Sequence, residues 1–133
     1  MSHVLLQMDL FSGLIMSDIE IWNKQKSDYN LLSIAIDTGA SVSTISRNIL
    51  YRAGYDVFNG KKNSIITASG VESVTEVTVD RIKLDSFEVV NVLVYAYDFP
   101  QESFASGVLG LNVLSMFDVN LLFSKKLIEL TKI

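Results

Sequence analysis

An apolar run that ends abruptly in a polar loop constrains this chain more than any other part of its sequence. The run covers residues 31–36 (LLSIAI), and the segment Asp-Thr-Gly-Ala-Ser follows it at residues 37–41. A short, nearly continuous apolar run is typical of a strand that is buried on both faces of a sheet. We therefore expect Asp37 to stand at the end of a buried strand, shielded from bulk water.

A carboxylate in this position has two possible roles. It can cap a local turn by accepting a hydrogen bond from the amide of Gly39 or Ala40, which is the usual behaviour of Asp before a turn glycine. It can also carry chemistry, because functional sites often hold carboxylates at the ends of buried strands. The rest of the sequence must decide between the two roles.

Composition limits the chemistry that this chain can perform. Its 133 residues, 49% of them apolar, predict one domain over residues 1–133, in which residues 1–13 form a flexible or accessory N-terminal segment. A net charge of -4 argues against nucleic acid as a partner. With no cysteine and a single histidine, His3, the chain lacks thiol nucleophiles and the means for a Ser-His-Asp triad or a multi-histidine metal site. We expect carboxylates to do any acid–base work, without metal or cofactor.

Targeting signals are equally scarce. The first eleven residues have no basic region, and Asp9 interrupts their apolar character, so they do not resemble a signal peptide. No apolar run is long enough to span a bilayer. We expect a cytoplasmic protein with no membrane segment.

Periodicity predicts an all-β protein with one or two short helices. Alternation over residues 14–22 and a polar turn over residues 23–30 predict a hairpin with the strand that ends at Asp37. A short helix should begin after the N-cap Ser46 and end at Gly54. The remaining predicted elements are a core strand at 87–97, a loop at 99–103, a second helix over the apolar positions 111–117, and strands at 119–123 and 127–130.

Another hairpin is predicted between residues 65 and 79, and it has small residues at its tip. Ile65 and Ile66 lead into Thr67-Ala68-Ser69-Gly70, and valines follow at alternating positions. On local grounds this could be an ordinary β-turn. Small residues at a tip would also let its backbone approach a ligand closely.

The order of these features resembles the retropepsin-like aspartic proteases. That family carries an Asp-Thr-Gly-Ala/Ser loop, then a hairpin, then an apolar-apolar-glycine motif before a helix, which here is Val108-Leu109-Gly110. The resemblance implies an acid-protease half-barrel with one lobe per chain. It also implies an internal duplication, in which the second loop packs beside the first and supports it.

The resemblance further implies a role for each matching residue. Asp37 would be the catalytic acid, with Thr38 bonding the partner's loop and the Gly39 amide facing the carboxylate. Ala40 and Ser41 would shape the loop where it meets substrate, and the Ser41 hydroxyl could bond the outer carboxylate oxygen. The hairpin would be a flap whose tip residues contact substrate, although it lacks the multi-glycine run of retroviral flaps. These tip residues are Thr67, Ala68, Ser69 and Gly70, and the support of the catalytic loop falls to Val108, Leu109 and Gly110.

One catalytic loop per chain implies two chains. Hydrolysis of a peptide bond without metal, thiol or histidine needs two carboxyl groups that share one proton. The sequence holds one Asp-Thr-Gly, so we expect a symmetric homodimer that cleaves polypeptides with Asp37 from each copy. The apolar tail, residues 127–133, could interleave with the partner's or form an ordinary edge strand.

Two other functions fit parts of the same pattern. Sugar kinases and actin-like ATPases also carry Asp-x-Gly before Ser or Thr, but they need two large lobes and this chain has no phosphate-cradling glycine loop. The stronger alternative is a catalytically inactive retropepsin-fold module that dimerises or binds peptides.

Overall fold

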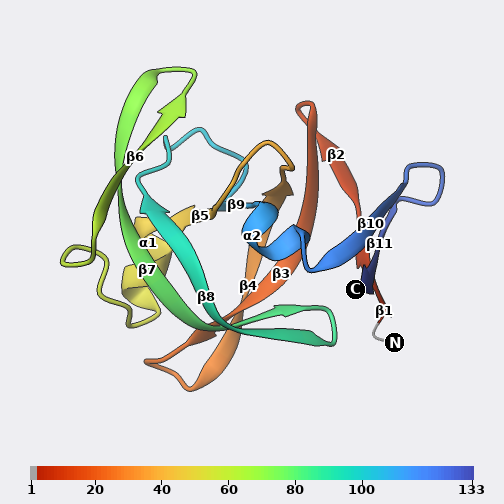
Figure 1. The fold of residues 1–133 in the computed structure, drawn as a ribbon, viewed down its shortest axis with the longest axis horizontal. Helices are drawn as coiled ribbons and strands as arrows, with labels where there is room; N and C mark the ends of the chain where they lie inside the picture. The colour runs from red at the N-terminus through yellow and green to blue at the C-terminus, as the bar shows by residue number, and fades with distance from the viewer. Residues whose placement is uncertain (1–2) are drawn as a thin grey trace.

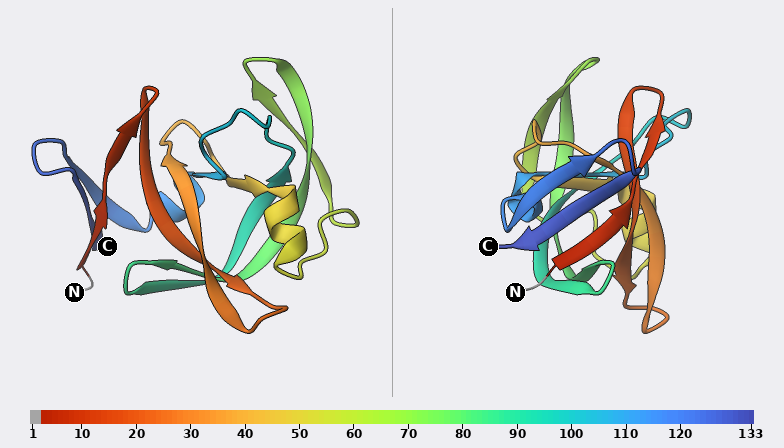
Figure 2. Two further views of the ribbon diagram at one scale, coloured as in Figure 1. Left: turned by 180° about the vertical axis from the view of Figure 1, so that it is seen from behind. Right: turned by 90° about the vertical axis from the view of Figure 1, so that its right-hand side faces the viewer.

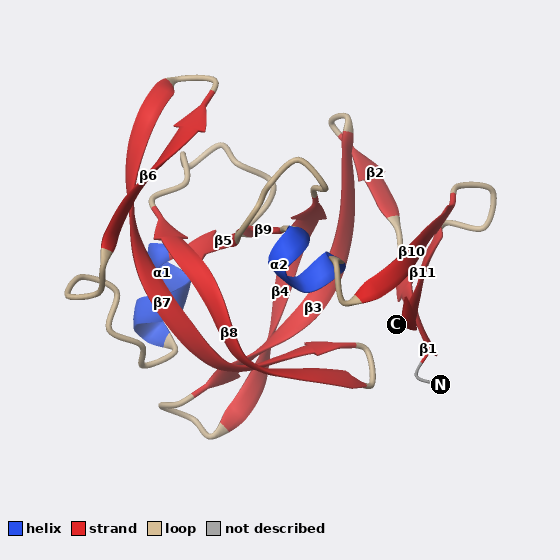
Figure 3. Cartoon of the chain, in the orientation of Figure 1, coloured by secondary structure: helices blue, strands red, loops and turns tan. Residues whose placement is uncertain are grey.

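The computed structural model describes residues 3–133, which form eleven strands and two short helices (Figures 1 and 3). This confirms the prediction of an all-β protein with one or two short helices. In chain order the elements are β1 (His3–Gln7), β2 (Asp9–Phe11), β3 (Leu14–Asn23), β4 (Asp28–Ile36), β5 (Ser43–Ser46), α1 (Arg47–Arg52), β6 (Lys62–Thr67), β7 (Gly70–Leu84), β8 (Phe87–Tyr97), β9 (Gly107–Leu109), α2 (Leu111–Leu114), β10 (Phe117–Leu122) and β11 (Leu127–Lys132).

Two sheets build the fold. The larger has eight strands in the order β2-β3-β4-β9-β5-β8-β7-β6, and it bends back on itself because β3 also pairs with β7 at Glu20↔Lys83 and Ile21↔Ile82. The smaller has the order β1-β11-β10 and lies at one side of the larger sheet (Figures 1 and 2). One apolar core joins them, since buried residues of β11 belong to the same cluster as those of β3, β4 and β8.

The strand before Asp37 is buried on both faces only near its end. Leu31 is 72% exposed, whereas Ala35 is 5% exposed and packs with Met16 and Val108. The physical reason is coverage: on the second face Ala35 lies in a small apolar cluster with Met16, Ala105 and Val108, and Leu31 is not part of it. The expectation of burial on both faces was therefore wrong for Leu31.

Both helices are short, and the second is shorter than predicted. Helix α1 begins after Ser46 as expected, although the Ser46 side chain makes no capping bond, and Gly54 follows the helix with a positive φ of 93°. Helix α2 ends at Leu114, and Phe117 already belongs to β10, where its ring packs 5.0 Å from that of Phe87. The apolar spacing over residues 111–117 thus combines a single helical turn with the start of a strand.

The two ends of the chain meet in the smaller sheet. Within the N-terminal segment, β1 pairs with β11, and His3 lies 2.9 Å from the Glu129 carboxylate; Met1 and Ser2 lie outside the described residues. Strand β11 also pairs with β10. The tail is therefore the centre of a sheet, neither an edge strand nor a free segment, because both of its edges are occupied by its own chain.

No helix within residues 3–133 combines the length and the apolar character needed to cross a membrane.

Adjacent residues of β4 allow a test of this packing. We expect Leu32→Ala, at a position 2% exposed, to lower the free energy of unfolding by about 2–5 kcal/mol through lost burial and a residual cavity. Leu31→Ala should change it by less than about 0.5 kcal/mol. Urea unfolding of the two variants measures both values, and equal losses would contradict the burial described for β4.

Candidate active site

Asp37 leads the loop that joins β4 to β5, and its backbone is fixed by the second motif. The Asp37 amide donates to the carbonyl of Leu109 at 3.0 Å, which extends the parallel pairing of β4 with β9. The Gly39 amide donates to Asp37 Oδ1 at 2.8 Å. The predicted turn-capping role is thus present, and it occupies one carboxylate oxygen; Oδ2 accepts no hydrogen bond from residues 3–133.

The Asp37 side chain is exposed in the single chain. The expectation that it is shielded from water was wrong, because the loop lies past the covered part of β4 and opens onto a groove. A Cβ at Gly39 would lie 3.1 Å from Asp37 Oδ1, so a side chain there would crowd the carboxylate. Thr38 is also exposed, and the Ser41 hydroxyl makes no bond to the carboxylate within the described residues.

The motif Val108-Leu109-Gly110 lies directly beside this loop. Val108 and Leu109 belong to strand β9, where the sequence had predicted a loop, and Gly110 leads into α2. A Cβ on Gly110 would come within 2.7 Å of the Ala40 carbonyl oxygen. That same carbonyl accepts from the Leu111 amide at 2.8 Å. Only glycine permits such a close approach of two backbones.

Two polar residues that sequence reasoning missed lock the loops together. Ser43 is 1% exposed, and its hydroxyl accepts from the Gly110 amide at 3.0 Å and donates to Asn112 Oδ1 at 2.9 Å. Asn112 Oδ1 also accepts from the Ser43 amide at 2.8 Å, and Asn112 Nδ2 donates to the Leu93 carbonyl at 2.7 Å. For Asn112 the available signal was a polar residue inside the apolar run 108–114, because polar groups in such a run require partners; Ser43 lies among other polar residues and carried no such signal.

A groove of about 650 Å³ lies between the Asp37 loop, the β6–β7 hairpin and the end of β8. The rings of Tyr97 and Phe99 pack edge to face at 4.9 Å and form part of its wall. Burial, reinforced by the negative charges of Glu72 and Asp98, raises the pKa of Tyr97. The residues lining the groove are Asp37, Gly39, Ala40, Ser41, Val42, Thr44, Ser64, Ile65, Ile66, Thr67, Tyr95, Tyr97, Phe99 and Val108.

The hairpin predicted as a flap is present, with a tip of Ala68 and Ser69 between β6 and β7. Gly70 adopts a φ of 112°, and the Thr67 hydroxyl accepts from the Ser69 amide at 3.2 Å. Thr67 lines the groove, whereas Ala68, Ser69 and Gly70 do not. Of the nominated site residues, the structure thus brings Asp37, Gly39, Ala40, Ser41, Thr67 and Val108 to one groove.

No metal centre is formed by the part of the chain that the structure describes. Nowhere in residues 3–133 do three or more His, Cys, Asp or Glu side chains gather in a way that could hold a metal ion.

Comparison with protein families and solved structures gives a consistent result. The sequence pattern of the family described as "gag-polyprotein putative aspartyl protease" matches residues 28–116, which include the Asp37 loop, the hairpin and Gly110. No curated protein matches the chain.

Two solved structures share the fold. A retropepsin-like aspartic protease from Rickettsia conorii is 17% identical, with a TM-score of 0.67, over 97% of this chain and 89% of that one. The retroviral protease-like domain of Ddi1 from Leishmania major is 13% identical, with a TM-score of 0.54, over 98% of this chain and 95% of that one. At these identities the likeness concerns the fold, and it confirms the predicted retropepsin-like half-barrel.

The link between Ser43 and Asn112 can be tested by substitution. We expect Asn112→Ala to lower the free energy of unfolding by about 1–3 kcal/mol, because it leaves the Ser43 amide and the Leu93 carbonyl without their partner. Chemical denaturation measures the loss. Asn120→Ala, which removes one exposed bond of 3.3 Å to Glu129, is the matched control and should cost less than about 0.5 kcal/mol. Equal values would contradict a structural role for Asn112.

Proposed function

Because the chain belongs to the family of retropepsin-like, gag-polyprotein-type aspartyl proteases, we propose that it is an aspartic endopeptidase that works as a homodimer. The observation that carries the proposal is the placement of Asp37: an exposed carboxylate with a free oxygen, facing a groove beside a flap-like hairpin. A residue that served only to cap its turn would not need to open onto a groove of peptide-binding size.

The groove by itself is half of a catalytic site. Among the described residues that line it, Asp37 is the only one with a carboxylate, and none carries a cationic side chain. The second carboxyl group must therefore come from another copy of the chain. Thr38 is exposed next to Asp37, so its hydroxyl is free to bond the partner's loop across the two-fold axis.

In the dimer, the two carboxyl groups would share one proton and hold a water molecule between them. The ionised group takes a proton from this water as its oxygen attacks the peptide carbonyl carbon. The protonated group donates its proton to the carbonyl oxygen. The tetrahedral intermediate is then a gem-diol. The carboxyl group that took the water proton donates it to the leaving nitrogen, while the other carboxylate takes a proton from one hydroxyl of the gem-diol; the C–N bond breaks, the product carboxylic acid forms, and one proton is again shared by the pair. The Gly39 amide, 2.8 Å from Asp37 Oδ1, keeps the carboxylate in its plane.

The substrate would lie extended between the Asp37 loop and the flap. Strand β6 forms the edge of the larger sheet, so its backbone can pair with an added peptide strand. Ala40 and Ser41 would contact the peptide from below, and the tip, residues 67–70, would reach it when the flap closes. Tyr97 and Phe99 offer an apolar wall to its side chains.

Strand β11 cannot itself extend a sheet into the second copy, because both of its edges are already paired. In the described part of the chain, the smaller sheet has open outer edges at β1 and β10. Either edge can extend the sheet into a second copy. We further propose that residues 1–133 act as a single domain in the cytoplasm, where a chain without cysteine loses nothing to the reducing conditions.

The first test removes the catalytic acid. We expect Asp37→Asn to reduce cleavage of a peptide library, or self-cleavage, by at least about 1,000-fold while leaving the unfolding free energy nearly unchanged. Asp18→Asn, at an exposed position of β3, is the matched control and should keep full activity. Activity that survives in Asp37→Asn would overturn the assignment. A wild-type chain that dimerises and binds peptides without cleaving them would establish the inactive module instead.

The second test uses pH. A pair that works with one shared proton loses activity when that proton leaves, so the cleavage rate should peak on the acid side of neutrality and fall at higher pH. A pH profile of kcat/KM with a neutral peptide measures this. A rate that keeps rising above about pH 8 would contradict the shared-proton mechanism.

A further inference from the structure

We propose that Arg47 is a positioning residue that clamps the hinge of the flap and ties it to the aromatic wall of the groove. The flap here means the β6–β7 hairpin over residues 62–74. The inference rests on the proposed function, in that this hairpin closes over a substrate. Arg47 itself lines a different pocket and is not among the residues that line the groove.

The hinge is defined by strand pairing. Strand β7 pairs with β8 from Leu84↔Phe87 to Thr75↔Ala96. Beyond Thr75 towards the tip, β7 pairs only with β6, from Thr75↔Lys62 to Gly70↔Thr67. The hairpin therefore leaves the sheet at Thr75 and Ala96, and Figure 1 shows it projecting away from β8 beyond this point. A two-stranded ribbon is held weakly by itself, so its angle depends on this junction.

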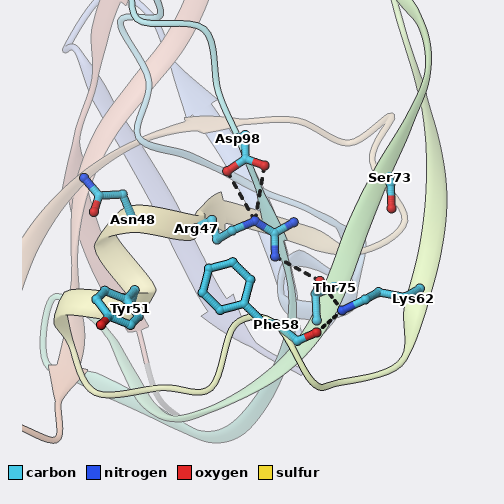
Figure 4. Close-up of a pocket in the computed structure, with 8 residues that line it drawn as sticks. All are labelled: Arg47, Asn48, Tyr51, Phe58, Lys62, Ser73, Thr75 and Asp98. Atoms are coloured by element: carbon cyan, nitrogen blue, oxygen red, sulfur yellow. Dashed lines mark hydrogen bonds and ion pairs between the residues drawn. The ribbon is translucent and has the colours of Figure 1, made fainter.

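Arg47 bonds both strands at that junction, and Figure 4 shows its bond to Thr75 of β7. Its Nη1 donates to Thr75 Oγ1 at 2.9 Å and its Nη2 donates to the Ala96 carbonyl at 3.1 Å. Nη1 also donates to the Val57 carbonyl in the segment after α1. The Arg47 side chain is 13% exposed and Thr75 is 1% exposed, so water competes little for these bonds. One guanidinium thus joins α1, the flap base and β8.

The same side chain also contacts the segment that carries the aromatic wall of the groove. Arg47 Nε lies 3.2 Å from each carboxylate oxygen of Asp98. Asp98 stands between Tyr97 and Phe99, the two rings that pack at 4.9 Å and line the groove. Because the Asp98 side chain is 77% exposed, this ion pair alone contributes little to stability. Its geometric effect is to fix the backbone between the two rings.

The position of Arg47 in the chain connects this clamp to Asp37. Arg47 is the first residue of α1 and follows directly after β5, which begins just past the Asp37 loop. Strand β5 pairs with β8 at Ile45↔Ala96 and with β9 at Ile45↔Gly107. A short, well-paired strand therefore sets the distance between the catalytic loop and the hinge.

The pocket beside Arg47 makes the proposal testable. It measures about 770 Å³, and Phe58 and Lys62 line it together with Arg47. Lys62 Nζ lies 3.2 Å from Thr75 Oγ1, and the Arg47 guanidinium carbon lies 5.7 Å from the Phe58 ring centroid. Solvent can enter this open space when residue 47 is shortened. Substitution there should therefore loosen the hinge without opening a cavity in the core.

The experiment compares Arg47→Met and Arg47→Lys with wild type by amide hydrogen exchange. This measurement does not depend on whether the chain cleaves peptides. We expect exchange of residues 62–74 to rise about tenfold or more in Arg47→Met, while residues 87–94 of β8 stay unchanged. Arg47→Lys should lie between the two, because an ammonium carries charge but lacks the planar fork with which the guanidinium reaches four acceptor groups. With a peptide substrate, KM should rise about three- to tenfold and kcat should change less.

Two further variants keep the result interpretable. Asp98→Asn leaves the bonds of Arg47 to Thr75 and Ala96 in place and should raise KM with little effect on flap exchange. Glu88→Gln, at the opposite end of β8, replaces a carboxylate that accepts from the Tyr29 hydroxyl at 2.5 Å, and should change neither quantity.

Wild-type flap exchange in a folded Arg47→Met, or equal effects from Glu88→Gln, would overturn the clamp. If Arg47→Met fails to fold, unchanged KM in Asp98→Asn would overturn the link to the groove wall. If the wild-type chain cleaves no peptide but Arg47→Met shows the expected rise in exchange over residues 62–74, the proposed function is contradicted and the role of Arg47 at the hinge is supported.

Discussion

The pairing of the Asp37 loop with the segment around Gly110 is the constraint on which the rest of the structure depends. Strands β4 and β9 run parallel, and their ladder continues into the bond from the Asp37 amide to the Leu109 carbonyl. Gly107 and Gly110 let the backbones come this close, since a Cβ on either would lie under 3 Å from the carbonyl oxygen of Thr44 or Ala40. The Asp37 loop is therefore held largely by backbone hydrogen bonds.

This rigid backbone explains how an exposed carboxylate can be well placed. Asp37 is open to solvent, yet its main chain is tied to β9 and one of its oxygens to Gly39. The loop is fixed by the buried Ser43 and the half-buried Asn112, whose side chains bond each other while the Ser43 hydroxyl also accepts from the Gly110 amide. The acid is thus pre-organised while its outer oxygen stays free for a partner, which suits a site completed by a second chain.

The β6–β7 hairpin is held in a different way. It leaves the sheet as a two-stranded ribbon, and at its base the backbone ladder is joined by bonds from the side chains of Lys62 and Arg47 to the Thr75 hydroxyl. Side-chain bonds lengthen or exchange more easily than a backbone ladder, so we expect the hairpin to move more readily than the Asp37 loop. The structure therefore combines a tightly bonded Asp37 loop with a projecting hairpin, and the two are joined through β5 and the first residue of α1.

The sequence by itself determined the strands β3, β4, β8, β10 and β11, the hairpin with its small tip, the loop at Asp37 and the glycine motif beside it, but not the strands β1, β2, β5 and β9. These follow from local rules: period-two alternation, turn residues, and glycine where backbones approach. Only the tertiary structure decided that Leu31 is exposed, that α2 stops at Leu114, that β11 is central in its sheet, and that Arg47 meets Thr75 and Asp98. Each of these depends on which distant segment covers a given face or edge. Such coverage arises from contacts between residues far apart in the chain, and the local pattern of apolar and polar residues does not specify which distant residues make them.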